Sequence, residues 1–97
     1  MPPLPHGHAP PAELGATIEL LKVLLKAAAA RHRVAPRLIA DAEDLERIAL
    51  EEEPDIAVLK GWRRELFGGD ALRLKRGELA LSLVDGEVTT IPASRGR

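Results

Sequence analysis

The chain of 97 residues contains no cysteine and no tyrosine, and it has one tryptophan and one phenylalanine. Without cysteine there is no disulfide, no thiolate metal site and no cysteine nucleophile. No apolar run reaches the ~20 residues that a membrane-spanning helix needs. The first residues lack a basic segment followed by a continuous apolar core, so we expect no signal peptide. These absences favour a cytoplasmic protein without a membrane partner.

The apolar residues that remain are almost all aliphatic. Apolar residues make up 45% of the chain and charged residues 30%, which is typical of one small globular domain. A domain of this length buries only ~60–65% of the surface of its unfolded chain. We expect the two large rings, Trp62 and Phe67, to be buried together as the packing anchor of a core built from Leu, Ile, Val and Ala.

The two ends of the chain differ from its centre. Residues 1–12 are rich in proline and have no apolar periodicity, which predicts an extended linker. Residues 13–91 hold the periodic segments and form the predicted domain. Residues 92–97 begin with a proline and continue as a polar stretch, so we expect a flexible tail.

Residues 13–33 have the clearest helical pattern. Their apolar side chains recur at spacings of three and four, which predicts an amphipathic helix with one stripe toward the core. The stripe comprises Leu14, Ile18, Leu20, Leu21, Leu24, Leu25, Ala28 and Ala29. Pro36 disfavours helical backbone at Ala35 and suits the first turn of a second, short helix over residues 36–40.

Three further helices are predicted. Asp41 is a good N-cap for a helix that ends before the next proline. A helix over residues 56–67 is expected to carry both rings and to end at Gly68, because glycine readily adopts the left-handed conformation that follows a helix. Asp70 is then expected to cap a last helix over residues 71–76.

The C-terminal segment alternates in polarity. Leu79, Leu81 and Leu83 are separated by smaller residues, and an Asp-Gly pair at 85–86 precedes a second alternating stretch at 87–91. This pattern is typical of a hairpin with a two-residue turn, whose leucine face must pack on the helices. The predicted fold class is therefore mainly α, a compact bundle of four to five short helices with a small C-terminal β-hairpin.

The charges are unevenly distributed although the net charge is only −1. Residues 41–55 carry eight acids and one base, whereas residues 60–76 carry six bases and two acids. If the two short helices in the basic segment fold back on each other, their cations converge into one patch that contacts phosphates. The candidate nucleic-acid-binding residues are Lys60, Arg63, Arg64, Arg73, Lys75 and Arg76. Both segments are equally well explained as solvated helix faces, or as a surface that docks onto a protein.

The sequence offers no convincing catalytic site. His6 and His8 lie in the proline-rich segment without carboxylate support, so we expect no metal there. The Asp-x-Glu pairs at 41–43 and 85–87 resemble two-metal sites, but a helix cap and a hairpin turn explain them. Neither serine lies in a nucleophile elbow. We expect no cofactor and no catalysis by this chain alone.

Several blocks of the sequence resemble the C-terminal end of bacterial ribonuclease D, the region of the helicase-and-ribonuclease-D C-terminal (HRDC) domains. The blocks are residues 19–26, residues 34–40, residues 44–46, the segment Leu-Lys-Gly-Trp-Arg-Arg-Glu-Leu-Phe-Gly at 59–68, and residues 70–72. The segment at 59–68 is the most specific of them. The resemblance runs from about residue 17 to residue 91.

The resemblance implies a helical accessory module beside an exonuclease domain, where it helps to hold RNA, typically tRNA precursors, for 3′-end trimming. The catalytic acids of that family lie in a separate domain, and none can be carried over to this chain. Arg63 and Arg64 match basic positions of the family motif. The leading hypothesis is thus a noncatalytic module that binds RNA or single-stranded nucleic acid weakly and without sequence preference; the alternative is a scaffold module that packs against a catalytic domain.

Overall fold

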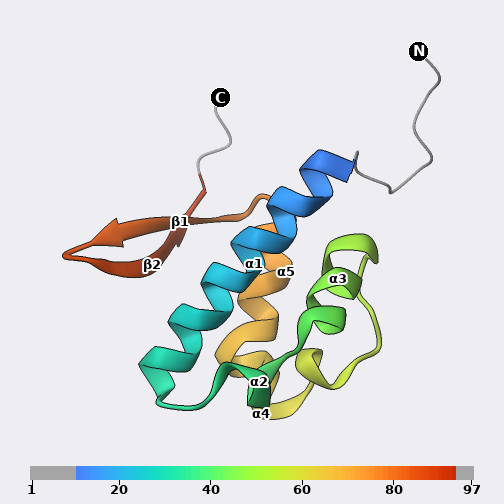
Figure 1. Cartoon of the computed structure of the whole chain (residues 1–97), viewed down its shortest axis with the longest axis horizontal. Helices are drawn as coiled ribbons and strands as arrows, with labels where there is room; N and C mark the ends of the chain where they lie inside the picture. Colours follow the sequence, from blue (N-terminus) through green and yellow to red (C-terminus); the bar gives the residue numbers. More distant parts are fainter. Residues whose placement is uncertain (1–10, 94–97) are drawn as a thin grey trace.

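A long N-terminal helix forms one side of a small helical bundle in the computed structural model, which describes residues 11–93 (Figure 1). The helical elements are α1 (Pro11–His32), α2 (Pro36–Ile39), α3 (Ala42–Leu50), the 3₁₀ turn η1 (Ala57–Leu59), α4 (Gly61–Arg63), the π-helical segment η2 (Arg64–Gly68) and α5 (Gly69–Lys75). An antiparallel hairpin of β1 (Leu79–Val84) and β2 (Glu87–Pro92) follows. The predicted fold, mainly α with a small C-terminal hairpin, is confirmed. The predicted linker falls before the described residues, apart from the first two residues of α1.

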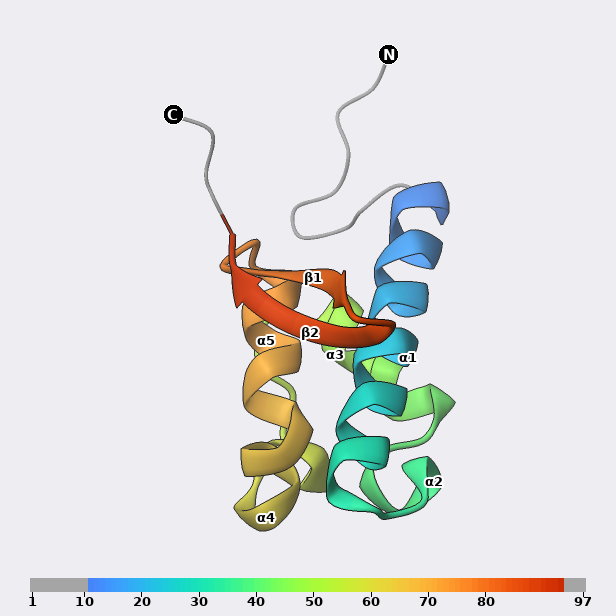
Figure 2. The same cartoon turned by 90° about the vertical axis from the view of Figure 1, so that its left-hand side faces the viewer.

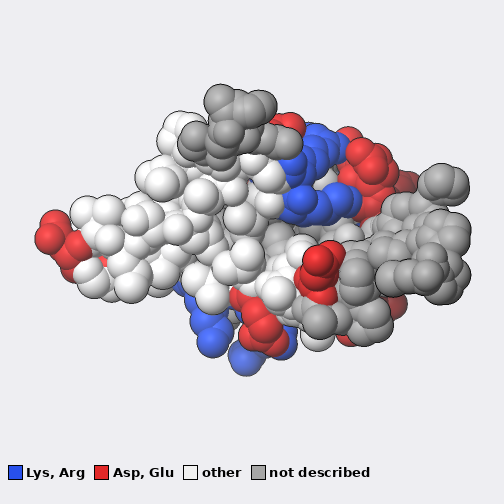
Figure 3. Space-filling view, turned by 90° about the horizontal axis from the view of Figure 1, so that it is seen from above, with Lys and Arg blue, Asp and Glu red and all other residues white. Residues whose placement is uncertain are grey.

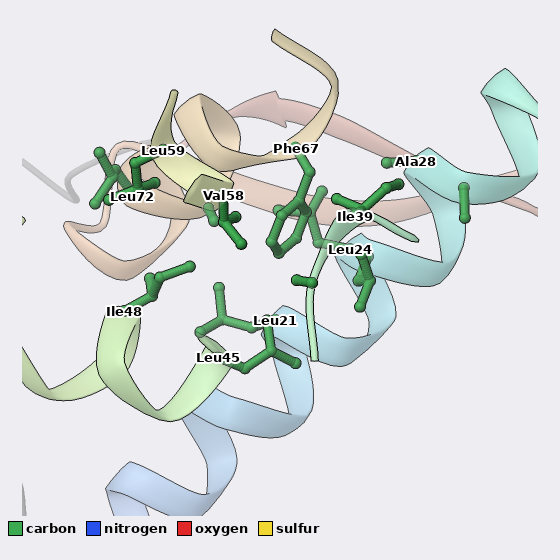
Figure 4. Packing of buried hydrophobic residues seen from close by; sticks show 14 residues of the cluster. Leu21, Leu24, Ala28, Ile39, Leu45, Ile48, Val58, Leu59, Phe67 and Leu72 are labelled. Carbon is green, nitrogen blue, oxygen red and sulfur yellow. The ribbon is translucent and has the colours of Figure 1, made fainter. Parts of the chain in front are cut away.

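The core lies where α1, α3 and the α4–α5 segment meet. Phe67 is fully buried, and its ring lies near Leu24, Ile39 and Val58 (Figure 4). The other core side chains are aliphatic, as the composition predicts: Leu21, Leu25, Ala28, Ala29, Ala40, Leu45, Ile48, Leu59, Ala71 and Leu72. The stripe predicted for α1 is confirmed from Ile18 to Ala29 except at Leu20, which is exposed beside the hairpin; Leu14 is half-buried outside the core.

Trp62 is 46% exposed, so the prediction that both rings are buried is wrong for this residue. Trp62 and Phe67 are five residues apart in one helical segment, and Phe67 is fully buried whereas Trp62 is exposed. The helix therefore presents only one of the two rings to the core. Phe67 takes that position, and Trp62 lies in the first turn, on the molecular surface.

The start of α3 follows the sequence prediction. The Asp41 carboxylate accepts a hydrogen bond of 2.9 Å from the Asp44 backbone N–H, and the Asp44 carboxylate accepts one of 3.0 Å from the Asp41 N–H. This reciprocal capping box satisfies two amide groups that a helix start leaves unpaired. The helix ends at Leu50, and the three glutamates at 51–53 are not helical, because acids are unfavourable at the negative end of a helix dipole.

The second half of the bundle differs from the prediction of two helices separated at Gly68. The break lies instead at Gly61, whose backbone is left-handed with φ of 59°. From there one uninterrupted helical segment runs through α4, η2 and α5 to Lys75, and both Gly68 and Gly69 have helical backbone. Asp70 consequently lies inside the helix and caps nothing.

The C-terminal hairpin is confirmed. β1 pairs with β2 in the register Leu79↔Pro92 to Val84↔Glu87. Asp85 and Gly86 have φ of 54° and 81°, which is the geometry of a type I′ turn. The leucine face is less buried than predicted, because Leu81 packs on the core while Leu83 near the turn is 70% exposed.

Candidate nucleic-acid interface

Five of the six basic residues predicted as a binding site lie along one helical segment or at its C-terminal end, and Lys60 lies just before it in extended backbone. Arg63 and Arg64 are in its first turns, and Lys75 and Arg76 are at its end. Twelve residues of helix separate the two groups by roughly 18 Å at about 1.5 Å per residue. The expectation that two short helices fold back on each other is therefore wrong, although the Arg64 and Arg76 side chains still reach one shared carboxylate, that of Glu53.

Acidic side chains of the preceding loop lie between these cations. Glu53 is 3.7 Å from the Arg64 guanidinium and 3.5 Å from that of Arg76, so one carboxylate bridges both. Lys60 pairs with Asp55, and Arg73 pairs with Asp70 at 3.7 Å. Seen from above, the basic and acidic surfaces adjoin (Figure 3). Two acids of the acidic segment, Glu53 and Asp55, thus neutralise three of the six cations of the basic segment.

Lys75 is held by the same loop. Its ammonium group donates hydrogen bonds to the backbone carbonyls of Glu51 and Glu52, the latter at 3.0 Å. Partial burial lowers the pKa of Lys75, while the neighbouring glutamates oppose this shift. The ammonium group therefore acts as a tie between the loop and α5.

The net electrostatic field around residues 51–76 is consequently small. Residues 51–76 hold six acids and six bases, so their formal charges cancel. The ion pairs are exposed, and pairs of this kind contribute little stability because water screens them. An RNA phosphate would have to displace a carboxylate to reach Arg64 or Arg76.

A second basic surface was missed by the sequence prediction. Residues 20–40 contain five bases and no acid. Within the described residues only one of these bases, Lys22, forms an ion pair, at 3.2 Å to Glu19. The other basic residues of this surface are Lys26 and Arg31 on α1, Arg33 just after α1, and Arg37 on α2. The uninterrupted absence of acids over 21 residues is the sequence signal that identifies this surface.

Trp62 lies at the same end of the molecule. The C-terminal end of α1, α2 and α4 occupy the lower end in both views (Figures 1 and 2). The Arg63 guanidinium carbon lies over the Trp62 ring, 4.5 Å from its centroid. Arg63 Nε also donates a 3.0 Å hydrogen bond to the Leu38 carbonyl of α2. This contact joins the exposed indole to the segment that carries Arg37.

We name the groups at this end of the molecule the basic end, defined as Arg31, Arg33, Arg37, Trp62 and Arg63; Arg31 also lines the groove at the hairpin turn. Among residues 11–93, Arg31, Arg33 and Arg37 form no ion pair or side-chain hydrogen bond. Of the six residues predicted from the sequence, Arg63 alone belongs to this surface.

An apolar surface lies at the hairpin. A groove of about 480 Å³ runs between α1 and the hairpin turn; its apolar lining residues Val23, Ala27, Ala30 and Val88 are joined by the charged residues Lys26, Arg31 and Glu87. Leu20 and Leu83 line a smaller groove beside it. Seen from above, the hairpin is largely free of charged side chains except at its tip (Figure 3).

The described residues offer no acid or histidine cluster that fits a metal ion. Asp41 is engaged in the capping box of α3, and Asp85 is in the hairpin turn. The pair His6 and His8 lies outside the described residues. None of the helices between residues 11 and 93 is long and apolar enough to cross a membrane.

Comparison with known proteins identifies close relatives of most of the chain. It is 53% identical over 79 residues to ribonuclease D of Nitrobacter hamburgensis, and the aligned residues make up 81% of this chain and 21% of the relative. It is 54% identical over 78 residues to that of Gluconacetobacter diazotrophicus, covering 80% and 20% of the two chains. For Granulibacter bethesdensis ribonuclease D the identity is 57% over 72 residues, or 74% and 18%. The chain thus spans about a fifth of the length of these curated relatives. No family model and no solved structure matches it.

Proposed function

We propose, because this chain is homologous to a segment that makes up about a fifth of ribonuclease D, that it is a noncatalytic accessory module that binds RNA. In this proposal it corresponds to the C-terminal, HRDC-like part of a cytoplasmic 3′–5′ exoribonuclease of tRNA 3′ processing. The module holds the RNA strand, and a separate exonuclease domain cleaves it.

The observation that carries the proposal is the basic end. Its three arginines without acidic partners in the described residues are available to phosphates without displacing a carboxylate. Contacts to phosphates give affinity that depends on salt and not on base sequence. An accessory module that holds many different RNA ends needs this kind of binding.

The remaining residues of the original candidate set have a secondary role in this proposal. Lys60, Arg64, Arg73 and Arg76 are paired with acids, so they contribute only where a phosphate takes the place of a carboxylate. Lys75 is held by backbone carbonyls. These residues extend the surface along the helix but do not determine its affinity.

The test is a titration of a fluorescently labelled single-stranded RNA with the 97-residue chain, followed by anisotropy at increasing salt. About three phosphate contacts on a single strand predict a slope of about −2 for log affinity against log salt concentration. A duplex RNA of the same length serves as the comparison. Absence of a salt-dependent signal at low ionic strength with either RNA would refute RNA binding.

The apolar surface at the hairpin supports a second candidate function, a scaffold that packs on the rest of a ribonuclease D. Val23 and Leu83 are exposed large hydrophobic residues beside the grooves, and exposed apolar patches of this kind mark protein contacts. The occupant in this alternative is the part of the relatives that the chain does not match.

This alternative is tested by mixing the tagged chain with a ribonuclease D relative from which the matching segment has been removed. Complex formation that survives nuclease treatment and is lost in Val23→Glu with Leu83→Glu would support docking through this face. Leu38→Glu is the matched control, because Leu38 is also exposed but lies on α2. Failure to form the complex, or equal loss in the control, would count against it.

A further inference from the structure

We propose that Trp62 is a stacking platform for an unpaired base of single-stranded RNA, with Arg37 and Arg33 holding the adjacent phosphates. The inference rests on the proposed RNA-binding function. It adds which residues contact the RNA and which part of the RNA they bind, namely unpaired nucleotides. Three observations support it: the exposure of the ring, its fixation and the cations at the same end of the molecule.

The ring is exposed in a chain that has little aromatic surface. Of the two large rings, Phe67 is entirely buried and serves the core, whereas Trp62 makes no part of the buried cluster. An indole at the surface has a flat face that any base can stack on, and such stacking contributes substantially to single-strand binding. In the chain's described part Trp62 is the aromatic side chain available for this contact.

The ring is also held in place. Gly61 turns the chain with φ of 59° so that the helix begins directly before Trp62. The guanidinium group of Arg63 covers part of the ring at 4.5 Å and is itself fixed by its hydrogen bond to the Leu38 carbonyl. A ring that is ordered before binding loses less conformational entropy when a base stacks on it.

The charge around the ring selects a polyanion over a protein. Arg37 is adjacent in sequence to Leu38, so its Cα lies about 3.8 Å from that of the residue that binds Arg63. Arg33 follows α1 at the same end of the molecule (Figure 2). Because residues 20–40 contain no acid, nothing in that segment competes with phosphates for these cations. Alternating aromatic and cationic groups are the combination by which proteins hold single strands.

The test uses the fact that Trp62 is the only tryptophan in the chain. Its intrinsic fluorescence is recorded while unlabelled single-stranded RNA is added, with a duplex of the same length as the comparison. Stacking predicts quenching by the single strand at the concentrations where anisotropy reports binding, and little quenching by the duplex.

Two variants with matched controls separate the contributions. Trp62→Leu should weaken single-strand binding about tenfold by removing the stacking face, whereas Leu83→Ala on the distant hairpin should leave it unchanged. Arg37→Gln should make the salt slope shallower by about 0.7, the value for one lost phosphate contact on a single strand. Arg47→Gln, which removes a cation of α3 that is already paired with Glu51 at 2.9 Å, should leave the slope unchanged. Circular dichroism verifies that each variant is folded.

The outcomes distinguish this inference from the function on which it rests. If the wild type binds RNA but Trp62 emission does not change and Trp62→Leu binds normally, the stacking platform is refuted while RNA binding stands. Quenching by the duplex alone would also refute it. If the wild type binds no RNA at all, both proposals fail.

Discussion

Gly68 packs directly against the backbone of Val58, and no side chain fits between them. A Cβ atom at Gly68 would collide with the Val58 carbonyl oxygen and would lie 2.9 Å from Leu59 Cδ2. The glycine therefore allows the π-helical segment to approach η1 closely. This contact holds the 3₁₀ turn against the helix that carries Phe67 and Trp62.

Gly68→Ala should accordingly destabilise the domain by about 1–3 kcal/mol, the usual cost of forcing extra atoms into a packed site, although alanine is the better helix former. Urea unfolding of the variant gives the change in free energy. Gly15→Ala is the control, since a Cβ there has no neighbour within 4 Å. In that exposed position of α1 alanine should stabilise by about 0.5–1 kcal/mol. A neutral Gly68→Ala would show that the close contact does not form.

The two rings should differ strongly in their contribution to stability. Phe67→Ala removes a fully buried ring and should cost about 3–5 kcal/mol, much of the stability of so small a domain. Trp62→Ala should cost no more than about 1 kcal/mol, because the ring is 46% exposed. Thermal unfolding monitored by circular dichroism compares the two variants. Equal losses would mean that Trp62 is part of the core.

Two acids in the loop that follows α3, Glu51 and Asp55, should make the stability of the fold depend on pH. The hydrogen bond from Lys60 lowers the pKa of Asp55 below its ordinary 3.8, and that from Arg47 lowers the pKa of Glu51 below 4.5. A carboxylate whose pKa is lower in the folded state stabilises the fold above its ordinary pKa. That contribution is lost as the pH falls through the lowered value. Stability should thus decline in acid, and modestly, since both groups are exposed.

Asp55→Asn tests this origin. The variant lacks the carboxylate, so the stability difference between it and the wild type should be present at neutral pH and should vanish in strong acid. Urea unfolding at a series of pH values gives both curves. A difference that stays constant with pH would contradict a contribution from the ionised Asp55–Lys60 pair.

Local signals in the sequence were sufficient for much of the fold. The capping pattern at Asp41, the Asp-Gly turn at 85–86 and the apolar stripe of α1 each involve neighbours in sequence, and each element forms as predicted. The sequence predicts a helix end at Gly68, because glycine commonly occurs there. Its actual role depends on Val58, ten residues earlier, which no local pattern reveals.

The candidate site was harder to predict for the same reason. The cations at 60–76 formed a basic segment in the sequence, but folding places Glu53 between Arg64 and Arg76. Trp62 is exposed because the helix places Phe67 toward the core in its stead, and the sequence alone does not reveal which of the two rings takes that position. The acid-free segment at 20–40 was readable from the sequence, yet its proximity to Trp62 depends on the Arg63–Leu38 hydrogen bond across the bundle.

The most direct test of the account compares two triple variants in the single-strand RNA titration. Arg31→Gln, Arg33→Gln and Arg37→Gln together remove the three arginines of the basic end that have no acidic partner in the described residues. Arg64→Gln, Lys75→Gln and Arg76→Gln remove the same number of charges from cations that are held by Glu53 or by backbone carbonyls. The account predicts that the first variant loses RNA binding at the ionic strength where the wild type binds, and that the second stays within about threefold of the wild type because its cations are already partnered. Loss of binding in the second variant with retention in the first would contradict it.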